Sequence, residues 1–164
     1  MRPLNEMSVN LTYVQDTAYG KGIFAKTNIQ KSAVVIHANI LKIEAQRSKY
    51  SIEIGHNQHA IAEETLVFAN HSCEPTVYVQ HKQNMIYMLA SREIQPNEQI
   101  CFDYETTEAS IVAFNQCNCA SPQCRISLLG FASQEKLLRA IYPDYFFMPH
   151  LIAQKETLSA MALP

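Results

Sequence analysis

The stretch F-A-N-H-S-C-E-P, residues 68–75, sets small polar side chains and one cysteine directly before a proline. Such a combination favours a well-defined turn whose side chains form hydrogen bonds. An ordinary loop between two strands would explain the stretch equally well. Its significance therefore depends on three further motifs, which lie before and after it in the chain.

Three of the five cysteines lie in one short window, with the spacing C-x-C-x4-C at Cys117, Cys119 and Cys124. Thiolates bind zinc tetrahedrally, so these three ligands leave one position for a distant residue or for water. The candidates are Cys73, Cys101 and the six histidines. Cys101 lies in an apolar segment and is typical of a buried core thiol, whereas Cys73 lies in the polar turn. The spacing therefore predicts a zinc site, with Cys73 as the preferred fourth ligand; the alternative is a group of reduced cysteines without metal.

Two weaker motifs stand elsewhere in the chain. The G-x-G of residues 20–22 lets the backbone approach a ligand closely. Without a third glycine and a following helix, however, it is as typical of a hairpin turn as of a binding loop. Phe102-Asp103-Tyr104 closes an apolar strand, where a tyrosine more often anchors the edge of a core. Neither motif indicates a function by itself.

The composition is that of one globular domain. The chain has 164 residues, of which 48% are apolar and 17% charged. Its net charge is −2 and its 13 lysines and arginines form no basic run, so we expect no direct nucleic-acid partner. The N-terminus lacks a signal-peptide pattern and no apolar run approaches about 20 residues, so we expect no membrane span. We therefore expect an intracellular protein, cytoplasmic or, in a eukaryote, nuclear. The sequence leaves the oligomeric state open.

Short segments rich in Val, Ile, Tyr and Phe, separated by Gly, Pro and Asn, predict a mainly β fold. Two similar segments, 25–31 and 90–96, each follow one such strand and precede another, which indicates one turn design used twice. The predicted strands are 11–14, 22–25, 33–37, 40–43, 50–54, 76–81, 85–90 and 99–102.

Helices are expected in the C-terminal part of the chain. Ser133 is predicted to cap a helix over 134–142, with Glu135 in its first turn. A second helix is predicted over 150–160. The aromatic run 142–147 is expected to cover the core, with a partner contact as the alternative.

The four motifs occur in an order that resembles the SET-domain family of S-adenosylmethionine-dependent lysine methyltransferases. The family's G-x-G, apolar residue, F-A pattern is similar to residues 20–25, and its R-F-I-N-H-S-C-x-P-N pattern is similar to residues 67–76. Its E-E-L-T-F-D-Y run is similar to residues 98–104, and its post-SET segment C-x-C-x4-C-R to residues 117–125. The resemblance covers residues 11–131.

This resemblance implies a mainly β SET fold, with small curved sheets around a threaded, pseudoknot-like core, followed by C-terminal helices. It divides the chain into a SET domain (11–116), a post-SET zinc segment (117–131) and a C-terminal helical extension (132–164). It also implies that the segment ending in F-D-Y passes through a loop near N-H-S-C, an exception to the rule against threaded chains.

By the same resemblance, Tyr104 is the catalytic tyrosine of a methyl-transfer channel and Tyr50 is a second channel tyrosine. Phe102 holds the position that governs product number, and phenylalanine there implies more than one methyl group. The implied zinc ligands are Cys73, Cys117, Cys119 and Cys124, in agreement with the spacing. The residues implied to bind S-adenosylmethionine are Gly20, Lys21, Gly22, Asn70 and His71, with Leu129 or Phe131 over the adenine; a buried structural role is the alternative for His71.

The chain departs from the family pattern at Val67 and Thr76, where arginine and asparagine are usual, and at residues 37–39, which replace Y-x-G. Residues 44–66 are too few for a large insert that would build a peptide groove. The leading interpretation is methyl transfer to a lysine of a protein or peptide substrate. The alternatives are transfer to a small-molecule or non-lysine acceptor, which the short insert favours, and a noncatalytic binding module, which the retained Tyr104 disfavours.

Overall fold

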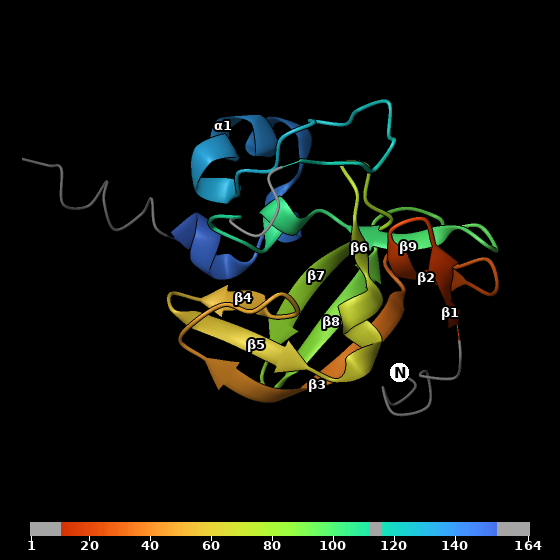
Figure 1. Ribbon diagram of the computed structural model, residues 1–164, viewed down its shortest axis with the longest axis horizontal. Coiled ribbons are helices and arrows are strands. Elements are labelled where there is room, and N and C mark those ends of the chain that lie inside the picture. Colours follow the sequence, from red (N-terminus) through yellow and green to blue (C-terminus); the bar gives the residue numbers. More distant parts are fainter. Residues whose placement is uncertain (1–10, 112–115, 154–164) are drawn as a thin grey trace, which may run out of the picture.

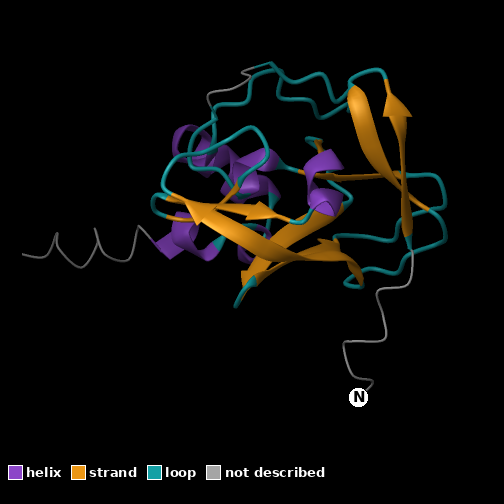
Figure 2. Ribbon diagram, turned by 60° about the horizontal axis from the view of Figure 1, so that its bottom comes forward, coloured by secondary structure: helices purple, strands orange, loops and turns teal. Residues whose placement is uncertain are grey.

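The structure is a computed structural model that describes residues 11–111 and 116–153 (Figure 1). The strands are β1 (Thr12–Thr17), β2 (Gly20–Ala25), β3 (Val34–Glu44), β4 (Ile52–Gly55), β5 (Gln58–Ala62), β6 (Asn70–His71), β7 (Val77–Lys82), β8 (Met85–Ala90) and β9 (Gln99–Phe102). The helices are η2 (Glu64–Phe68), η3 (Tyr104–Thr106) and η4 (Asp144–Phe146), of the 3-10 type, and α1 (Phe131–Ile141). One sheet has the order β1-β2-β9-β6 and the other β4-β5-β3-β8-β7. Both views place the β1–β2 hairpin at one end and α1 with the helices after it at the other (Figure 1, Figure 2). The mainly β fold with C-terminal helices is therefore confirmed.

The glycine motif begins in a hairpin turn. β1 and β2 pair antiparallel, with Thr17 opposite Gly20 across a two-residue turn. Gly20 has a φ of +105°, a conformation that glycine adopts without the steric cost of a side chain. β2 then pairs antiparallel with β9, which in turn pairs with β6 in parallel. The glycine motif thus forms part of a hairpin turn and the start of β2, the strand that pairs with β9.

β3 belongs to two strand pairs. Its first half, from Val34 to Asn39, pairs with β8, and its second half, from Ile40 to Glu44, pairs with β5. The sequence predicted separate strands at 33–37 and 40–43, and this was wrong because the partner changes while the strand continues. The predicted strands 85–90 and 99–102 are confirmed as β8 and β9, and the others overlap β1, β2, β4 and β7. β5 and β6 have no counterpart among the predicted strands.

The two similar turn segments pair with each other. Ile29 and Ile94 form an antiparallel bridge with two N–H···O distances of 2.9 Å, and both side chains are buried. On one side of this bridge Asn97 N–H donates to Ala25 O at 2.8 Å. On the other side Ser32 N–H donates to the carbonyl of Ala90 at 2.8 Å. The repeated turn therefore links the strands of the first sheet to those of the second.

α1 begins three residues earlier than predicted. Its N-cap is Gly130, with no side-chain cap among the described residues and no acidic residue in the first turn, so the expected roles of Ser133 and Glu135 were wrong. Phe131 N–H instead donates to Glu108 O at 2.9 Å. Ala132 N–H likewise donates to a backbone carbonyl, that of Ala109, at 3.0 Å. Backbone carbonyls of another segment thus accept hydrogen bonds from the first helical N–H groups. Rules based on the local sequence do not anticipate such contacts.

The aromatic run after α1 covers the core, as expected. Phe146 and Phe147 are buried, and Tyr142 stacks on Phe146 with ring centroids 4.8 Å apart. Residues 149–153 are helical, as predicted for the start of the second helix, and residues 154–160 of that prediction lie outside the described residues. Within the two described ranges, no helix is long and apolar enough to cross a membrane.

Candidate active site and metal centre

The polar turn holds the F-D-Y segment on both sides. β6 runs parallel to β9, and Ser72 N–H donates to Phe102 O at 3.1 Å. At the other end of the turn, Thr76 N–H donates to Cys101 O at 3.0 Å, and Thr76 Oγ1 accepts from Cys101 N–H at 2.9 Å. The threonine that replaces the family's asparagine therefore binds β9 directly. β9 lies against both ends of the turn, as expected for a threaded core.

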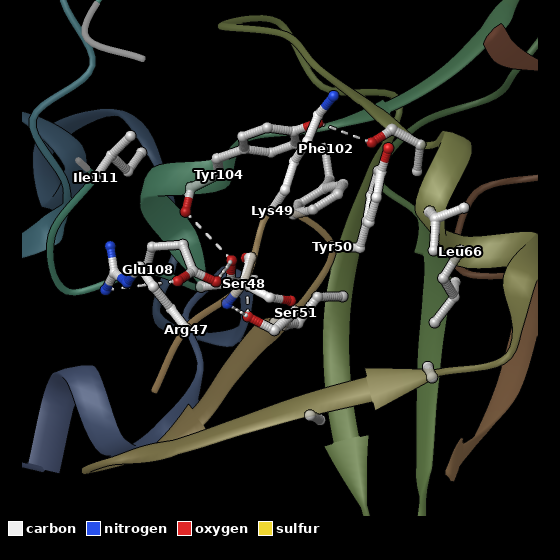
Figure 3. A pocket seen from close by; sticks show the side chains of 16 residues that line it. Arg47, Ser48, Lys49, Tyr50, Ser51, Leu66, Phe102, Tyr104, Glu108 and Ile111 are labelled. Atoms are coloured by element: carbon white, nitrogen blue, oxygen red, sulfur yellow. Dashed lines mark hydrogen bonds and ion pairs between the residues drawn. The ribbon is translucent and has the colours of Figure 1, made fainter. Parts of the chain in front are cut away.

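Tyr104 forms one wall of a pocket (Figure 3). Its hydroxyl donates to Ala69 O at 3.0 Å, and its ring lies 4.7 Å from the ring of Phe102. Burial raises the pKa of Tyr104 well above its usual range, so the hydroxyl stays protonated at neutral pH. The apolar residues that line the pocket are Ile52, Ala60, Ala62, Leu66, Val67, Ala69, Phe102 and Ile111. The pocket is therefore largely apolar around one protonated tyrosine.

Residues 47–51 line another side of the same pocket. Tyr50 is 54% exposed, and Lys49 Nζ lies 5.3 Å from the centroid of its ring. Figure 3 shows the hydroxyl ends of Tyr50 and Tyr104 directed toward the same end of the pocket. The structure thus brings the two predicted channel tyrosines together, one buried and one in an exposed segment.

The glycine segment contacts the polar turn through Asn70, whose Nδ2 donates to Lys21 O at 3.0 Å. A Cβ added at Gly22 would lie 2.6 Å from Gln99 Nε2, so a side chain there would require the flexible Gln99 amide to move. A Cβ added at Gly20 would meet nothing within 4 Å in the described structure. The predicted cofactor residues of the two motifs therefore meet at one edge of the first sheet, beside open space.

The cysteines of two distant motifs form one cluster. Cys73 Sγ lies 3.8 Å from Cys117 Sγ, and ligand atoms of His71, Cys73, Cys117 and Cys119 all lie within 4.8 Å of one another. Cys124 packs against the same group, with its Sγ 3.8 Å from Cys117 O. The four predicted cysteines thus lie together, and they are joined by His71, one of the six histidines that the spacing had left as candidates. This donor set suits Zn²⁺.

The pKa of the thiol differs between Cys119 and Cys101. Burial opposes ionisation of Cys119, but hydrogen bonds from the backbones of Cys73 and Ser121 lower its pKa to about 7. Cys101 is instead buried in β9, and burial raises its pKa to about 12. Cys119 therefore supplies a thiolate near neutral pH, whereas Cys101 behaves as the core thiol that was predicted.

His71 lies between the cysteines and Tyr104. Its Nδ1 accepts from Tyr104 N–H at 3.2 Å, so in the neutral ring the proton sits on Nε2. Nε2 faces Cys73 Sγ at 3.4 Å. Burial lowers the pKa of His71 to about 3, which keeps the ring neutral. A protonated Nε2 has no lone pair for a metal, so this geometry favours Cys124 as the fourth ligand, with His71 donating to the Cys73 sulfur.

Arg125 links the cysteine cluster to the F-D-Y segment. Its Nη2 lies 2.8 and 2.6 Å from the two carboxylate oxygens of Asp103, and its Nε lies 2.9 Å from Glu105 Oε2. Tyr142 Oη donates to both Asp103 Oδ2 at 2.9 Å and Cys73 O at 3.1 Å. Burial raises the pKa of Asp103 although Arg125 opposes the shift. The buried arginine therefore fixes the residue directly before Tyr104.

Of the two residues expected over the adenine, Leu129 is the accessible one, at 46% exposed. Phe131 is 4% exposed, and its ring packs 5.2 Å from that of Phe147. The role of Phe131 toward the cofactor stays a prediction, and the structure places its ring in the core.

Comparison with known proteins agrees with this arrangement. The profile of the SET domain matches residues 20–105, slightly more than half of the chain. The chain belongs to the SET-domain family. Enzymes of this family are methyltransferases that use S-adenosylmethionine, and the motifs identified above all lie within or directly after the matched SET region.

Two curated relatives and one solved structure illustrate the match. The SET chain is 31% identical over 78 residues to the histone-lysine N-methyltransferase ash1 of Drosophila melanogaster, covering 45% of this chain but 4% of that protein. It is 25% identical over 138 residues to the methyltransferase flvH of Aspergillus flavus, covering 80% of this chain and 76% of that protein. The structure of KRYPTONITE in complex with mCHG DNA and SAH aligns with a TM-score of 0.59 and 23% identity, over 71% of this chain and 28% of that one.

Two residues of the SET site were not predicted as functional. Arg125 directly follows the third cysteine of the post-SET motif, and that position was its one signal in the sequence. Glu108 lines the Tyr104 pocket, where burial raises its pKa to about 7. Nothing in the local sequence around Glu108 distinguishes it from an ordinary surface glutamate.

Proposed function

We propose that this SET-domain protein transfers methyl groups from S-adenosylmethionine to the side-chain amine of a lysine in a protein or peptide. The observation that carries the proposal is Tyr104, whose hydroxyl is fixed on Ala69 O inside an apolar pocket next to the N-H-S-C turn. S-adenosylmethionine, when bound, supplies an electrophilic methyl group on a sulfonium. The remaining task for the protein is to present a neutral amine in line with that group.

The residues that would hold the cofactor are those at the edge where β2 meets the polar turn. The open space beside Gly20 and the bond from Asn70 to Lys21 O support this placement. Backbone groups of a glycine segment can approach a ligand closely because no Cβ intervenes. Leu129, the exposed candidate, would cover an adenine from the post-SET side.

The pocket around Tyr104 would prepare the amine. A lysine ammonium has an ordinary pKa of about 10.4, and an apolar lining lowers it because the charged form loses solvation. The hydroxyl of Tyr104, with its proton directed at Ala69 O, presents oxygen density to a developing positive charge. Because the amine then reacts in its neutral form, having lost its proton to solvent, no strong general base is required. Positioning can supply about 7–11 kcal/mol in well-oriented reactions.

Zinc held by Cys73, Cys117, Cys119 and Cys124 would serve this site indirectly. Cys73 lies two residues after His71, and Arg125 follows Cys124 and binds Asp103. A metal that orders the post-SET segment would therefore order both the polar turn and the residue before Tyr104. We expect the cysteine cluster to be structural, because four protein ligands close a zinc site.

A small free amine is the second candidate acceptor. The flvH relative, named a methyltransferase without a stated substrate, matches 80% of this chain, whereas the histone-lysine enzyme ash1 matches 45% of it. Residues 47–51 also line the pocket directly, in a region where the chain has a short insert. A small acceptor would need no extended peptide groove.

One experiment separates these functions. The full chain is incubated with methyl-labelled S-adenosylmethionine and a fractionated lysate, and label is counted separately in protein and in small molecules. Label in lysine of protein supports the first proposal, and label in small amines alone supports the second. Tyr104→Phe and Asn70→Ala should abolish either signal, whereas Tyr145→Phe, at an exposed tyrosine far from the pocket lining, should retain it. No label in any fraction, together with no S-adenosylmethionine binding by calorimetry, would overturn both and indicate a noncatalytic module.

A further inference from the structure

A second cluster of ionisable side chains lies at the wall of the Tyr104 pocket, apart from the cysteines. Glu53 of β4 and His59 of β5 face each other across the hairpin, and both are buried, at 7% and 6% exposed. Glu108, after η3, lines the pocket, and His150 comes from the C-terminal helical segment. Their side chains are 13% and 11% exposed. The β4–β5 hairpin and two segments distant from it in the sequence therefore place two carboxylates and two imidazoles together.

Three ring nitrogens of this cluster are buried without a hydrogen-bond partner in the described structure: His59 Nδ1, His150 Nδ1 and His150 Nε2. His150 Nε2 lies 3.5 Å from Glu53 Oε1, which is long for a hydrogen bond. A buried polar atom left unsatisfied costs about 1–3 kcal/mol, and such atoms usually indicate a missing water or ion. One nitrogen of each imidazole can face the two carboxylates, so His59 Nδ1 and His150 Nε2 indicate a bound species between these groups.

Arg47 already contacts this cluster, but its ion pairs with the two carboxylates are long. Arg47 Nη2 lies 3.4 Å from Glu53 Oε2 and 3.8 Å from Glu108 Oε2, both longer than a good charge-assisted hydrogen bond. The Arg47 side chain is 29% exposed and its Nη1 also donates to Ser110 O, so a metal would have to displace Nη2 from the two carboxylates.

We propose that Glu53, His59, Glu108 and His150 bind a divalent transition-metal ion, of which Zn²⁺ is the test case. Ligand atoms of the first three residues all lie within 4.8 Å of one another. Two ligands bound to zinc at 2.0–2.1 Å in a tetrahedron are about 3.4 Å apart, so these three residues need to approach by up to about 1.4 Å. His150, which lies outside that group although its Nε2 is 3.5 Å from Glu53 Oε1, would have to move further. Imidazole nitrogen with carboxylate oxygen is a ligand set that suits zinc and its neighbours in the first transition row.

The proposed ion would be structural. Four side chains fill its coordination and leave no position for a substrate, as in closed zinc sites. It would tie the β4–β5 hairpin, the segment after η3 and the C-terminal helical segment into one wall of the pocket. This site would be independent of the cysteine cluster in both ligand chemistry and position in the sequence.

Metal content of the tag-free, full-length protein tests the proposal. After equilibration with Zn²⁺ and removal of excess, elemental mass spectrometry should give two ions per chain. His59→Gln and Glu108→Gln should each retain one, and His56→Gln, an exposed histidine on the same hairpin, should retain two. Cys119→Ser should also retain one, lost from the cysteine cluster.

Cobalt distinguishes which ion is lost. Co²⁺ bound by thiolates gives a strong sulfur-to-metal absorption, whereas a site of imidazoles and carboxylates gives only weak visible bands. His59→Gln and Glu108→Gln should lose the weak bands and keep the strong absorption. The proposal is overturned if both variants bind as much Zn²⁺ and Co²⁺ as the wild type. If His59→Gln does not fold, Glu108→Gln decides, because the glutamine can still accept from Glu53 N–H.

Discussion

Replacing Arg125 with methionine should lower the free energy of unfolding by about 3–5 kcal/mol, the range for removing one partner of a buried ion pair. The side chains of Arg125, Asp103 and Glu105 are 8%, 0% and 0% exposed, so methionine leaves two carboxylates buried without their cation. The three hydrogen bonds of 2.6–2.9 Å that disappear are all charge-assisted.

Urea unfolding followed by circular dichroism measures this loss, which corresponds to a melting temperature lower by roughly 6–20 °C for a chain of this size. The matched control is Arg139→Met on α1. Arg139 pairs with Glu135 at 2.9 Å, but the two side chains are 27% and 25% exposed, so we expect a loss below about 1 kcal/mol. Arg139 also pairs with Asp144 at 3.1 Å and lies 5.8 Å from the centroid of the Phe131 ring, so the difference between the variants compares a buried ion-pair network with a partly exposed one.

The pH dependence of the Arg125→Met loss gives an independent check. Burial raises the pKa of Asp103 above its unfolded value although Arg125 opposes the shift, so the contribution of this carboxyl to stability falls as pH rises through the interval between the two values. Without Arg125 that pKa rises further, and the deficit should be larger at about pH 8 than at about pH 4. A loss under about 1 kcal/mol, or one independent of pH, would refute the buried-pair reasoning.

Three further changes test other parts of the structure. Phe102 is 5% exposed and its ring centroid lies 4.7 Å from that of Tyr104, so Phe102→Tyr adds a hydroxyl to a filled wall of the pocket. Mass spectrometry should then show a product with one methyl group where the wild type adds several. Gly130 has a φ of +97°, and an added Cβ would lie 2.7 Å from Ala109 O. Gly130→Ala should therefore lower the free energy of unfolding in urea by more than about 2 kcal/mol. An unchanged midpoint would contradict the close docking of α1. Cys119→Ser should release one metal ion and lower the melting temperature, and a chelator should lower the melting temperature of the wild type by at least as much.

The local sequence predicted those parts of the fold whose partners lie nearby or whose chemistry is distinctive. Short apolar segments bounded by turn residues predicted β8 and β9 at their observed bounds. The spacing of Cys117, Cys119 and Cys124, with the polar position of Cys73, predicted a cluster that the structure brings together. Cysteine is rare and its metal chemistry is specific, so a short pattern carries much information.

Other features could not be predicted because their causes are contacts between distant segments. α1 begins at Phe131 because backbone carbonyls at Glu108 and Ala109 receive its first N–H groups. β3 continues through Ile40 because β5 takes over as its partner where β8 ends. Neither partner is visible in the residues of the element itself.

By itself, the sequence determined the order of the motifs, the mainly β character and the residues able to hold zinc, since each depends on residue type and short spacing. The tertiary structure alone decided that β9 lies against both ends of the polar turn and that His71 offers Tyr104 its Nδ1 lone pair. It also decided that Glu53, His59, Glu108 and His150 meet beside the pocket. The physical reason is that such contacts form when the two sheets and the C-terminal helices bury their apolar faces, which brings together side chains up to about a hundred residues apart.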